Sequence, residues 1–318
     1  MRAYVIKRLL LTVPVLLGVT VLTFVIMRVM PGDAAMAIVT GGGQGAGTLA
    51  DMARVRAELN LDQPLHIQYV EWLWRIVRLD LGHSWHSGRP IVDEIKLRFP
   101  VTFELAVLTV LMSILIAIPT GVICALRQDT LVDQLLRIVS VFGLTMPSFW
   151  TGTLILFSLV VWFNWFPPMG YTGLFENPLV NLQQVIWPAL AVGYFLSAYL
   201  ARMTRATMLE VLRQDYIRTA WSKGLKERAV VIRHALKNMM LPVVTLAGIQ
   251  IAVALEGSVV AESIFMLPGM GLALVGAIQQ RDYPVIQTFM LVLTLIVMVV
   301  NLLVDITYGW LDPRIRFS

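Results

Sequence analysis

The chain has 318 residues, of which 58% are hydrophobic and only 14% are charged, whereas an ordinary soluble domain carries about 25% charged residues. This composition excludes a water-soluble fold. The formal net charge of +5 does not indicate nucleic-acid binding, because the basic residues gather in particular loops and so report membrane topology. The single cysteine, Cys124, cannot form an internal disulfide and is expected to pack as a small hydrophobic residue.

Six apolar runs are long enough to cross a bilayer, since a hydrocarbon core roughly 30 Å thick needs about 20 apolar residues per helix. The runs cover residues 9–30, 101–126, 135–162, 185–201, 239–260 and 284–308. The third run is long and carries Pro147 near its middle. The fourth is weaker and contains Pro188, Gly193 and Ser197, which favours a helix packed among others over one facing lipid. The sequence therefore predicts an all-α integral membrane protein with six transmembrane helices.

The first run is predicted to be a retained membrane helix. It follows Arg2, Lys7 and Arg8, and a basic start before an apolar run also fits a cleaved signal peptide. The run extends over about 22 residues, whereas the core of a signal peptide has about 7 to 15. A retained span is therefore favoured over cleavage.

Residues 31–100 are predicted to form an extracytoplasmic helical insertion. Helices are expected at residues 49–59 and 64–79, and the second could lie along the membrane surface. Its apolar face would hold Ile67, Val70, Trp74 and Val77. His83 and His86 form a short HxxH motif, but no further His or Cys nearby completes a tetrahedral site, so no metal site is expected.

The distribution of basic residues predicts the orientation. Residues 202–238 contain nine Lys and Arg, whereas residues 164–184 contain none. Because loops rich in Lys and Arg stay in the cytoplasm, both termini and the 202–238 loop are expected to be cytoplasmic. The insertion carries seven basic and eight acidic residues, and a long loop crosses the membrane largely regardless of its charge.

The chain lacks the motifs of a membrane enzyme. It has four His and neither an HExxH nor a GxSxG motif. No GxxxxGK[ST] is present, so an ATPase that drives transport would be a separate subunit. An ion-coupled secondary transporter is the alternative, although its acidic residues would be expected near the bilayer midplane. Here Glu104, Glu256 and Asp305 lie toward the ends of the spans, and Glu256 is the deepest.

The segment at residues 208–244 is the most informative part of the chain. Its first half predicts a short amphipathic helix that ends at Gly224 and could dock in the groove of a partner. A loop solvated by its charges is the alternative. The expected apolar side of this helix holds Leu209, Leu212, Tyr216, Ala220 and the stem of Lys223.

This segment resembles the cytoplasmic coupling motif of the peptide-type permeases of ABC importers, the dipeptide, oligopeptide, glutathione and nickel group. The general importer motif has a glutamate where this chain has Arg218, and the longer spacing from Gly224 to Pro242 fits the peptide subclass. Trp221 and Met239 replace residues that are usually Arg and Ala. The matching residues are Tyr216, Ile217, Arg218, Thr219, Ala220, Lys223, Gly224 and Leu225, then His234, Ala235, Leu236, Asn238 and Pro242.

The resemblance covers essentially the full length, because further segments match in the same order. They are YVIKRLL at 4–10, MPGD at 30–33, LDQPLHIQY at 61–69, DLGHS at 80–84, MTRATMLEVL at 203–212, ESIFMLPGMG at 262–271, RDYPVIQ at 281–287 and NLLVDITYGWLDPRIR at 301–316.

The resemblance implies a type I ABC importer permease fold. Residues 1–30 would form the cytoplasmic N-terminus and first helix, residues 31–100 the periplasmic insertion, and residues 101–318 a five-helix core with its coupling loop at 202–238. The implied partners are a second homologous permease, two ATPase subunits that bind ATP and Mg²⁺, and a periplasmic or lipid-anchored solute-binding protein. This chain would be a non-catalytic subunit in the bacterial inner membrane, without a cofactor of its own.

The resemblance also implies three groups of site residues. ATPase coupling is expected at Arg213, Asp215, Tyr216, Arg218, Thr219, Ala220, Lys223, Gly224 and Leu225. An outer loop near the periplasmic gate, with contact to the binding protein as the alternative, is expected at Glu262, Phe265, Pro268, Gly269 and Gly271. Contact with the solute, with core packing as the alternative, is expected at Met146, Ser148, Gln250 and Glu256. The leading solute is a di- or oligopeptide, and glutathione, a nickel complex, an opine or a sugar conjugate are the alternatives.

Overall fold

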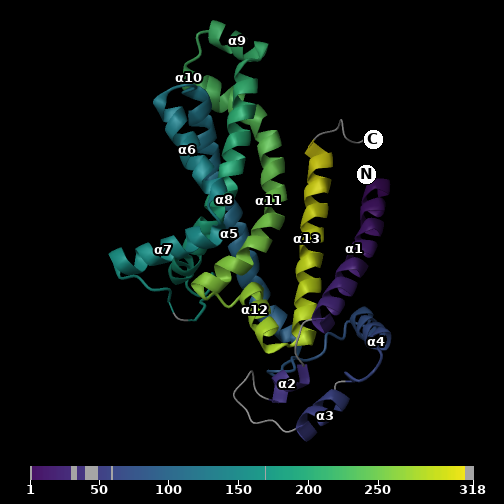
Figure 1. The fold of residues 1–318 in the computed structure, drawn as a ribbon. Coiled ribbons are helices and arrows are strands. Elements are labelled where there is room, and N and C mark those ends of the chain that lie inside the picture. Colours follow the sequence, from purple (N-terminus) through teal and green to yellow (C-terminus); the bar gives the residue numbers. More distant parts are fainter. Residues whose placement is uncertain (1, 30–33, 40–48, 59, 169, 312–318) are drawn as a thin grey trace. The chain divides into compact units, whose positions relative to one another are not determined.

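The computed structural model describes residues 2–29, 34–39, 49–58, 60–168 and 170–311, and these residues are helical apart from turns, connecting segments and one isolated bridge between His83 and Pro90. Five helices are long and apolar enough to span a membrane, and one bent pair makes up to six. The helices, drawn in Figure 1, are α1 (Arg2–Val29), α2 (Ala34–Val39), α3 (Leu49–Glu58), α4 (Leu65–Val77), α5 (Ile91–Leu126), α6 (Leu131–Thr145), α7 (Ser148–Phe163), α8 (Pro178–Leu212), α9 (Asp215–Ser222), α10 (Glu227–Ala229), the π-helix η1 (Val230–Ala235), α11 (Leu236–Phe265), α12 (Met270–Gln280) and α13 (Tyr283–Leu311).

The third apolar run does not form one continuous helix. α6 ends at Thr145, α7 begins at Ser148, and their axes are bent by 107°. Pro147 lies immediately before α7, where its missing N–H and fixed φ are tolerated, whereas inside a helix it would remove a backbone hydrogen bond. The expected single span at residues 135–162 is therefore corrected to a pair of helices.

The fourth apolar run is packed among other helices, as its small residues predicted. In α8, 67% of the most apolar stretch is buried, against 22–39% in the other long apolar helices. α8 is also much longer than the run itself, because polar residues continue the helix at both ends. Asn177 caps its start by accepting a hydrogen bond from the backbone N–H of Val180 at 3.3 Å.

The chain forms two compact units. Unit 1 comprises Met1–Val101 and Pro268–Val299, and unit 2 comprises Thr102–Leu267 and Val300–Ser318. α5 and α13 each contribute residues to both.

Unit 2 is built around α8, which packs against α6, α7 and α11. Glycines allow close approach between helices: a Cβ placed on Gly121 of α5 would lie 2.5 Å from the Cβ of Thr204 in α8, and one on Gly193 of α8 would lie 2.9 Å from the backbone oxygen of Thr109 in α5. Such contacts are the usual basis of helix association in lipid, where burial of apolar surface gives little driving force.

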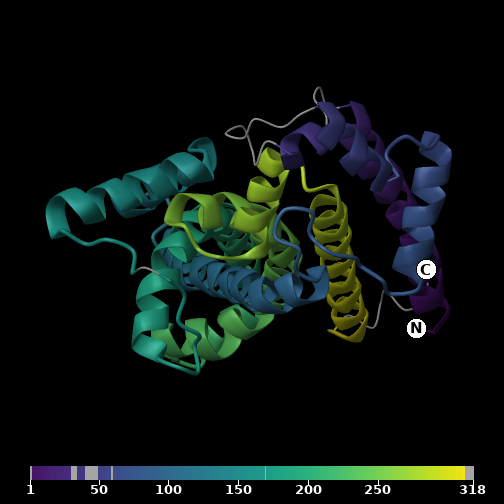
Figure 2. The same ribbon diagram turned by 90° about the horizontal axis from the view of Figure 1, so that it is seen from below.

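In unit 1, α4 lies along α1 (Figure 2). The Thr20 and Tyr69 hydroxyls are 2.9 Å apart, and the Phe24 and Tyr69 rings meet edge to face with centroids 5.3 Å apart. The opposite side of α4 leaves Val70 and Trp74 more than half exposed. The apolar face predicted for this helix is thus present and uncovered among the described residues.

Candidate functional site

The predicted coupling helix is α9 (Asp215–Ser222), which is shorter than the expected coupling segment at residues 213–225. Arg213 is the C-cap of α8, and Lys223 is the C-cap of α9. Gly224 has φ +73°, a left-handed conformation that glycine adopts at little cost and that commonly ends a helix. The sequence-based prediction of a stop at Gly224 is confirmed.

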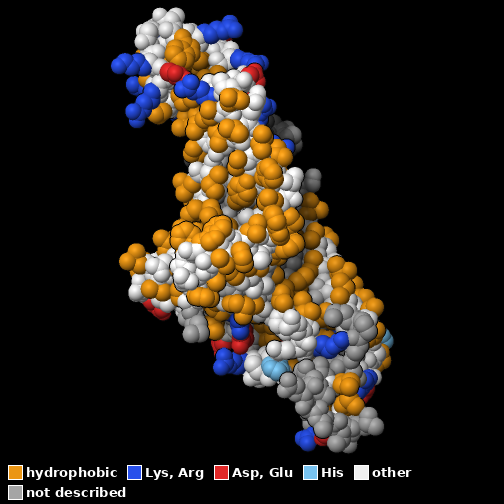
Figure 3. All heavy atoms as spheres, turned by 60° about the vertical axis from the view of Figure 1, so that its left-hand side comes forward, with side chains coloured by type: hydrophobic (Ala, Val, Ile, Leu, Met, Phe, Trp, Pro, Cys, Tyr) orange, Lys and Arg blue, Asp and Glu red, His pale blue; other side chains and the backbone are white. Residues whose placement is uncertain are grey.

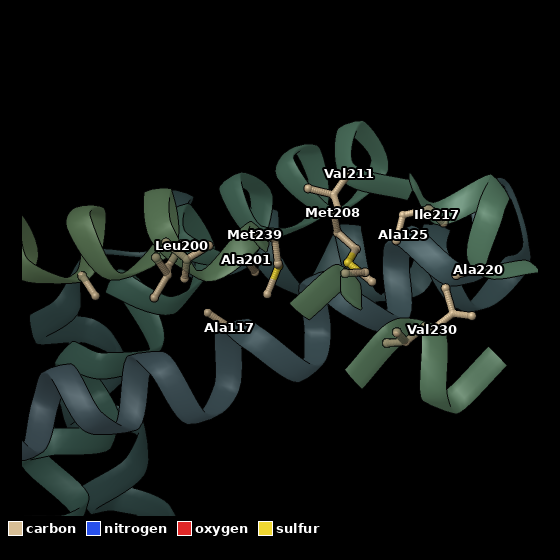
Figure 4. Close-up of a cluster of buried hydrophobic side chains, with 14 residues drawn as sticks. Ala117, Ala125, Leu200, Ala201, Met208, Val211, Ile217, Ala220, Val230 and Met239 are labelled. Carbon is tan, nitrogen blue, oxygen red and sulfur yellow. The ribbon is translucent and has the colours of Figure 1, made fainter. Parts of the chain in front are cut away.

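The inner face of α9 consists of Ile217 and Ala220, which are 0% and 6% exposed. They join a buried apolar cluster with Met208 of α8 and Val230 of η1 (Figure 4). The expected face was partly wrong: Leu209 and Leu212 belong to α8 and pack against the cluster from there, and Tyr216 is 42% exposed. Ile217 and Ala220 thus attach α9 to the neighbouring helices of unit 2 through its inner face.

A hydrogen bond joins the two halves of the coupling motif. The Asn238 side-chain amide at the start of α11 donates to the Tyr216 hydroxyl at 2.9 Å and to the backbone oxygen of His234 at 3.0 Å. The intervening η1 is a π-helix, a distortion that often occurs at functional sites. Sequence reasoning named Tyr216 and Asn238 separately, and the structure gives a physical reason for both.

The outer side of α9 carries charges that are weakly engaged. Arg218 lies 3.6 Å from Asp215, and their side chains are 75% and 96% exposed. Such an exposed pair contributes only about 0–1 kcal/mol, so either group can exchange its partner at little cost. Lys223, Trp221 and Leu225 are exposed as well. Figure 3 shows Lys and Arg side chains gathered at the end of unit 2 that carries α9, at the top of the view. Below them, hydrophobic side chains dominate the surface.

A buried ion pair between α6 and α8 was missed by sequence reasoning. Asp133 is 0% exposed, and its carboxylate accepts two hydrogen bonds from Arg205, at 3.1 and 2.9 Å. Arg137 lies 3.5 Å from the same carboxylate. The available signal was an acidic residue two positions before the predicted span at residues 135–162, together with an arginine in the matched segment 203–212.

The expected outer loop is corrected in part. Glu262 and Phe265 lie in the last turn of α11, 0% and 2% exposed, and Gly271 lies within α12. The Glu262 carboxylate accepts a hydrogen bond from Thr102 of α5 at 2.7 Å. Only Pro268 and Gly269, of the five expected residues, lie between the two helices.

The four candidate path residues fall in different environments. Gln250 is 4% exposed; it donates to the Leu196 backbone oxygen at 2.9 Å and accepts from Ser113 at 3.2 Å, so it is engaged in packing between α5, α8 and α11. Met146 and Ser148 flank the bend between α6 and α7 and are partly exposed.

Glu256, in contrast, is exposed on the apolar helix α11, and the described residues provide it with no hydrogen bond or ion pair. A charge within a membrane helix is costly and normally faces an aqueous cavity or a partner. Of the four candidates, Glu256 is thus the one whose surroundings fit contact with a group outside this chain.

One partly buried tyrosine attaches the loop before α8 to α5. The Tyr171 hydroxyl donates a hydrogen bond to the Glu104 carboxylate. Burial, and then this hydrogen bond, raise the pKa of the Tyr171 phenol.

Within the described part of the chain, no group of three or more His, Cys, Asp or Glu is placed to hold a metal ion.

Comparison with known proteins places this arrangement in a family. Residues 117–317 match the family described as binding-protein-dependent transport system inner membrane component, and residues 1–106 match its N-terminal region. A Brucella abortus protein provisionally named a peptide transport system permease is 42% identical over 318 residues, 100% of both chains. The Escherichia coli dipeptide transport system permease protein DppB is 38% identical over 99% of both chains, and the Bacillus subtilis oligopeptide transport system permease protein AppB is 38% identical over 100% of both. The chain therefore belongs to the inner membrane components of binding-protein-dependent transport systems, as a multi-pass permease subunit of an ABC importer.

Proposed function

We propose that this permease carries di- or oligopeptides across the bacterial inner membrane and is driven by separate ATPase subunits that dock on α9. The relatives support the substrate class, because those in Escherichia coli and Bacillus subtilis are named for dipeptide and oligopeptide transport. The observation that carries the coupling role is the construction of α9, whose inner face is fixed in the cluster while its charged outer face is free.

The attachment of α9 suits the transmission of force. Ile217 and Ala220 join it to α8 and η1 through buried contacts, and the bond from Asn238 to Tyr216 joins it to α11. A push on α9 by an ATPase subunit closing around ATP and Mg²⁺ would move these helices together, because packed helices shift as rigid bodies. Arg218 and Lys223 would pair with acidic groups of the ATPase, since their present partnerships are weak.

The translocation path would lie against a second, homologous permease. Glu256 is the best candidate on this chain, because an exposed carboxylate on an apolar helix is tolerated where it faces water or a partner. A solute-binding protein would deliver peptide on the side opposite the coupling loop. Both termini and α9 would be cytoplasmic, in agreement with the nine basic residues at 202–238.

The test is co-purification from native membranes together with peptide uptake into vesicles. We compare the wild type with Arg218→Glu and with the matched charge reversal Lys237→Glu, which alters an exposed residue of α11 outside the matching motif residues. Wild type and Lys237→Glu are expected to retain the ATPase and a second permease. Arg218→Glu should lose about tenfold or more of the ATPase, as expected for a charge-assisted contact.

Three outcomes would each contradict one part of the proposal. Equal recovery of the ATPase with both charge reversals would remove Arg218 from the coupling surface. Peptide uptake by the chain alone, without ATP, would replace the importer by an ion-coupled carrier. Competition of labelled dipeptide uptake by glutathione or a nickel complex, but not by other peptides, would reassign the solute while leaving the coupling intact.

A further inference from the structure

Unit 1 contains a cavity of about 430 Å³ that none of the preceding roles uses. It lies among the end of α1, α4, the segment before α5 and the start of α13. Three of the matching segments, at residues 61–69, 80–84 and 281–287, contribute to its lining. The lining residues that matter below are Arg28, Gln68, Trp72, Trp85, Tyr283 and Gln287.

The Arg28 guanidinium brings to this cavity a positive charge that forms no ion pair with the described residues. Its Nε and Nη2 donate to the neutral Oε1 of Gln68, at 3.1 and 2.7 Å. Its Cζ stands 4.5 Å from the ring centre of Phe24 and 4.8 Å from that of Tyr283. Nη1 is buried without a hydrogen-bond partner, and the described residues give Arg28 no ion pair. Arg28 as a whole is partly buried, and a charge withdrawn from water is costly unless an opposite charge accompanies it.

Gln287 also lines this cavity and carries a second donor without a partner. Gln287 is 4% exposed, and its Nε2 is buried without a partner. The carboxylates of Glu71 and Asp80 also line the cavity, but their side chains are exposed to solvent. Arg28 and Gln287 thus provide two donors without partners, one of them cationic. An anion with several acceptor oxygens suits such a pair.

The place of the cavity along the membrane helices identifies the anion. Arg28 lies in the last turn of the apolar span Leu10–Val29, and Tyr283 begins the apolar span Tyr283–Val304. Both therefore lie where the hydrocarbon gives way to the headgroup layer, and aromatic residues such as Trp72 and Trp85 are typical of that depth. Phosphate is the anion that every phospholipid places there. We propose that this cavity binds the phosphate of a membrane phospholipid headgroup through Arg28 and Gln287.

The test measures phospholipid retention on the full-length chain, purified with the subunits that accompany it, by native mass spectrometry during titration with phosphatidylglycerol. The variants are Arg28→Met, Gln287→Met and Gln287→Glu. The control is Arg78→Met, because Arg78 is an exposed arginine of unit 1 that stacks on Trp74 outside the cavity. Each donor removal should weaken the tightest lipid site about tenfold or more. Gln287→Glu should weaken it further, because its carboxylate would take the place of the phosphate beside Arg28.

The Gln287 variants keep the test decisive if Arg28→Met fails to fold. Retention in both Gln287 variants equal to that in the wild type and in Arg78→Met would overturn the proposal. Displacement of the bound lipid by millimolar inorganic phosphate would assign the cavity to a free anion instead of a lipid, and displacement by a dipeptide would assign it to the carboxylate of the transported solute. Displacement by neither, with loss in the variants, is the expected result.

Discussion

Different interactions stabilise the interior of each unit. In unit 2, Gly121 and Gly193 allow α5 and α8 to pack closely against each other. A buried apolar cluster attaches α9 to the neighbouring helices. In unit 1, a buried carboxylate organises a non-helical segment: Asp282, 3% exposed, accepts from the Ser84 hydroxyl at 2.5 Å and from the backbone N–H groups of Trp85 and His86 at 3.2 and 3.3 Å.

The difference follows from what each backbone needs. A membrane helix satisfies its own N–H and C=O groups, so its remaining task is close packing against neighbours. The segment between Asp80 and Ile91 has no regular helix, so its N–H groups need an acceptor from elsewhere. Asp282 supplies it and also accepts from the N–H of Val285 in the first turn of α13, at 3.5 Å. A single carboxylate thereby joins the matching segments 80–84 and 281–287.

The largest expected effect tests whether unit 2 depends on packing alone. Asp133→Ala would leave Arg205 without its buried partner, and breaking such a pair costs about 3 kcal/mol. The free energy of unfolding in mixed detergent micelles measures the loss. The control is Asp215→Ala, which removes a pair with 96% and 75% exposed side chains and should cost less than about 1 kcal/mol. Equal losses in the two variants would deny the buried pair any special role.

The next effect concerns the carboxylate of unit 1. Asp282→Ala removes the acceptor of the Ser84 hydroxyl and of three backbone N–H groups, so we expect a loss of about 2–3 kcal/mol. Asp282→Asn keeps one acceptor oxygen and should recover part of it. Protease cleavage within residues 80–90 should increase in the order wild type, Asn, Ala, and an unchanged cleavage pattern would contradict the organising role.

A smaller effect is expected from crowding the close approach of α5 and α8. Gly121→Ala would place a methyl group 2.5 Å from the Thr204 Cβ and 2.7 Å from the Ala201 backbone oxygen. Overpacking of this kind costs about 1–3 kcal/mol. The matched control is Gly276→Ala in α12, where no atom lies within 4 Å of the added Cβ. There the thermal midpoint should stay constant or rise, because alanine favours helix.

The smallest effect isolates the attachment of α9. Tyr216→Phe removes the acceptor of the Asn238 amide and should cost about 0.5–1 kcal/mol. Because Asn238 is exposed and keeps its bond to His234, the fold should persist. If this hydrogen bond transmits the movement of the ATPase to the permease helices, the number of ATP molecules hydrolysed per transported peptide should rise. A ratio unchanged from wild type would show that Ile217 and Ala220 suffice.

Much of the architecture was predictable because it depends on composition and local pattern. Apolar length predicted the membrane helices, small residues predicted the burial of α8, and Gly224 predicted the end of α9. The break at Pro147 was not predicted, because residues 135–162 were expected to form one span, and the 107° bend appears only in the structure. The coupling motif was recognised from residue types in order, which requires no knowledge of how they are placed in space.

Other features were decided only by tertiary structure, because they join residues far apart in the chain. The pairs Asp133–Arg205 and Ser84–Asp282, and the bond from Asn238 to Tyr216, depend on how helices pack. Gln250 and Glu256 look alike as polar residues in one apolar run, yet α8 and α5 satisfy the first while the second is left exposed. The sequence by itself determined that a polar group would lie in the membrane, and only the packing of neighbouring helices decided whether that group found a partner, because its energy depends on the atoms within hydrogen-bond distance.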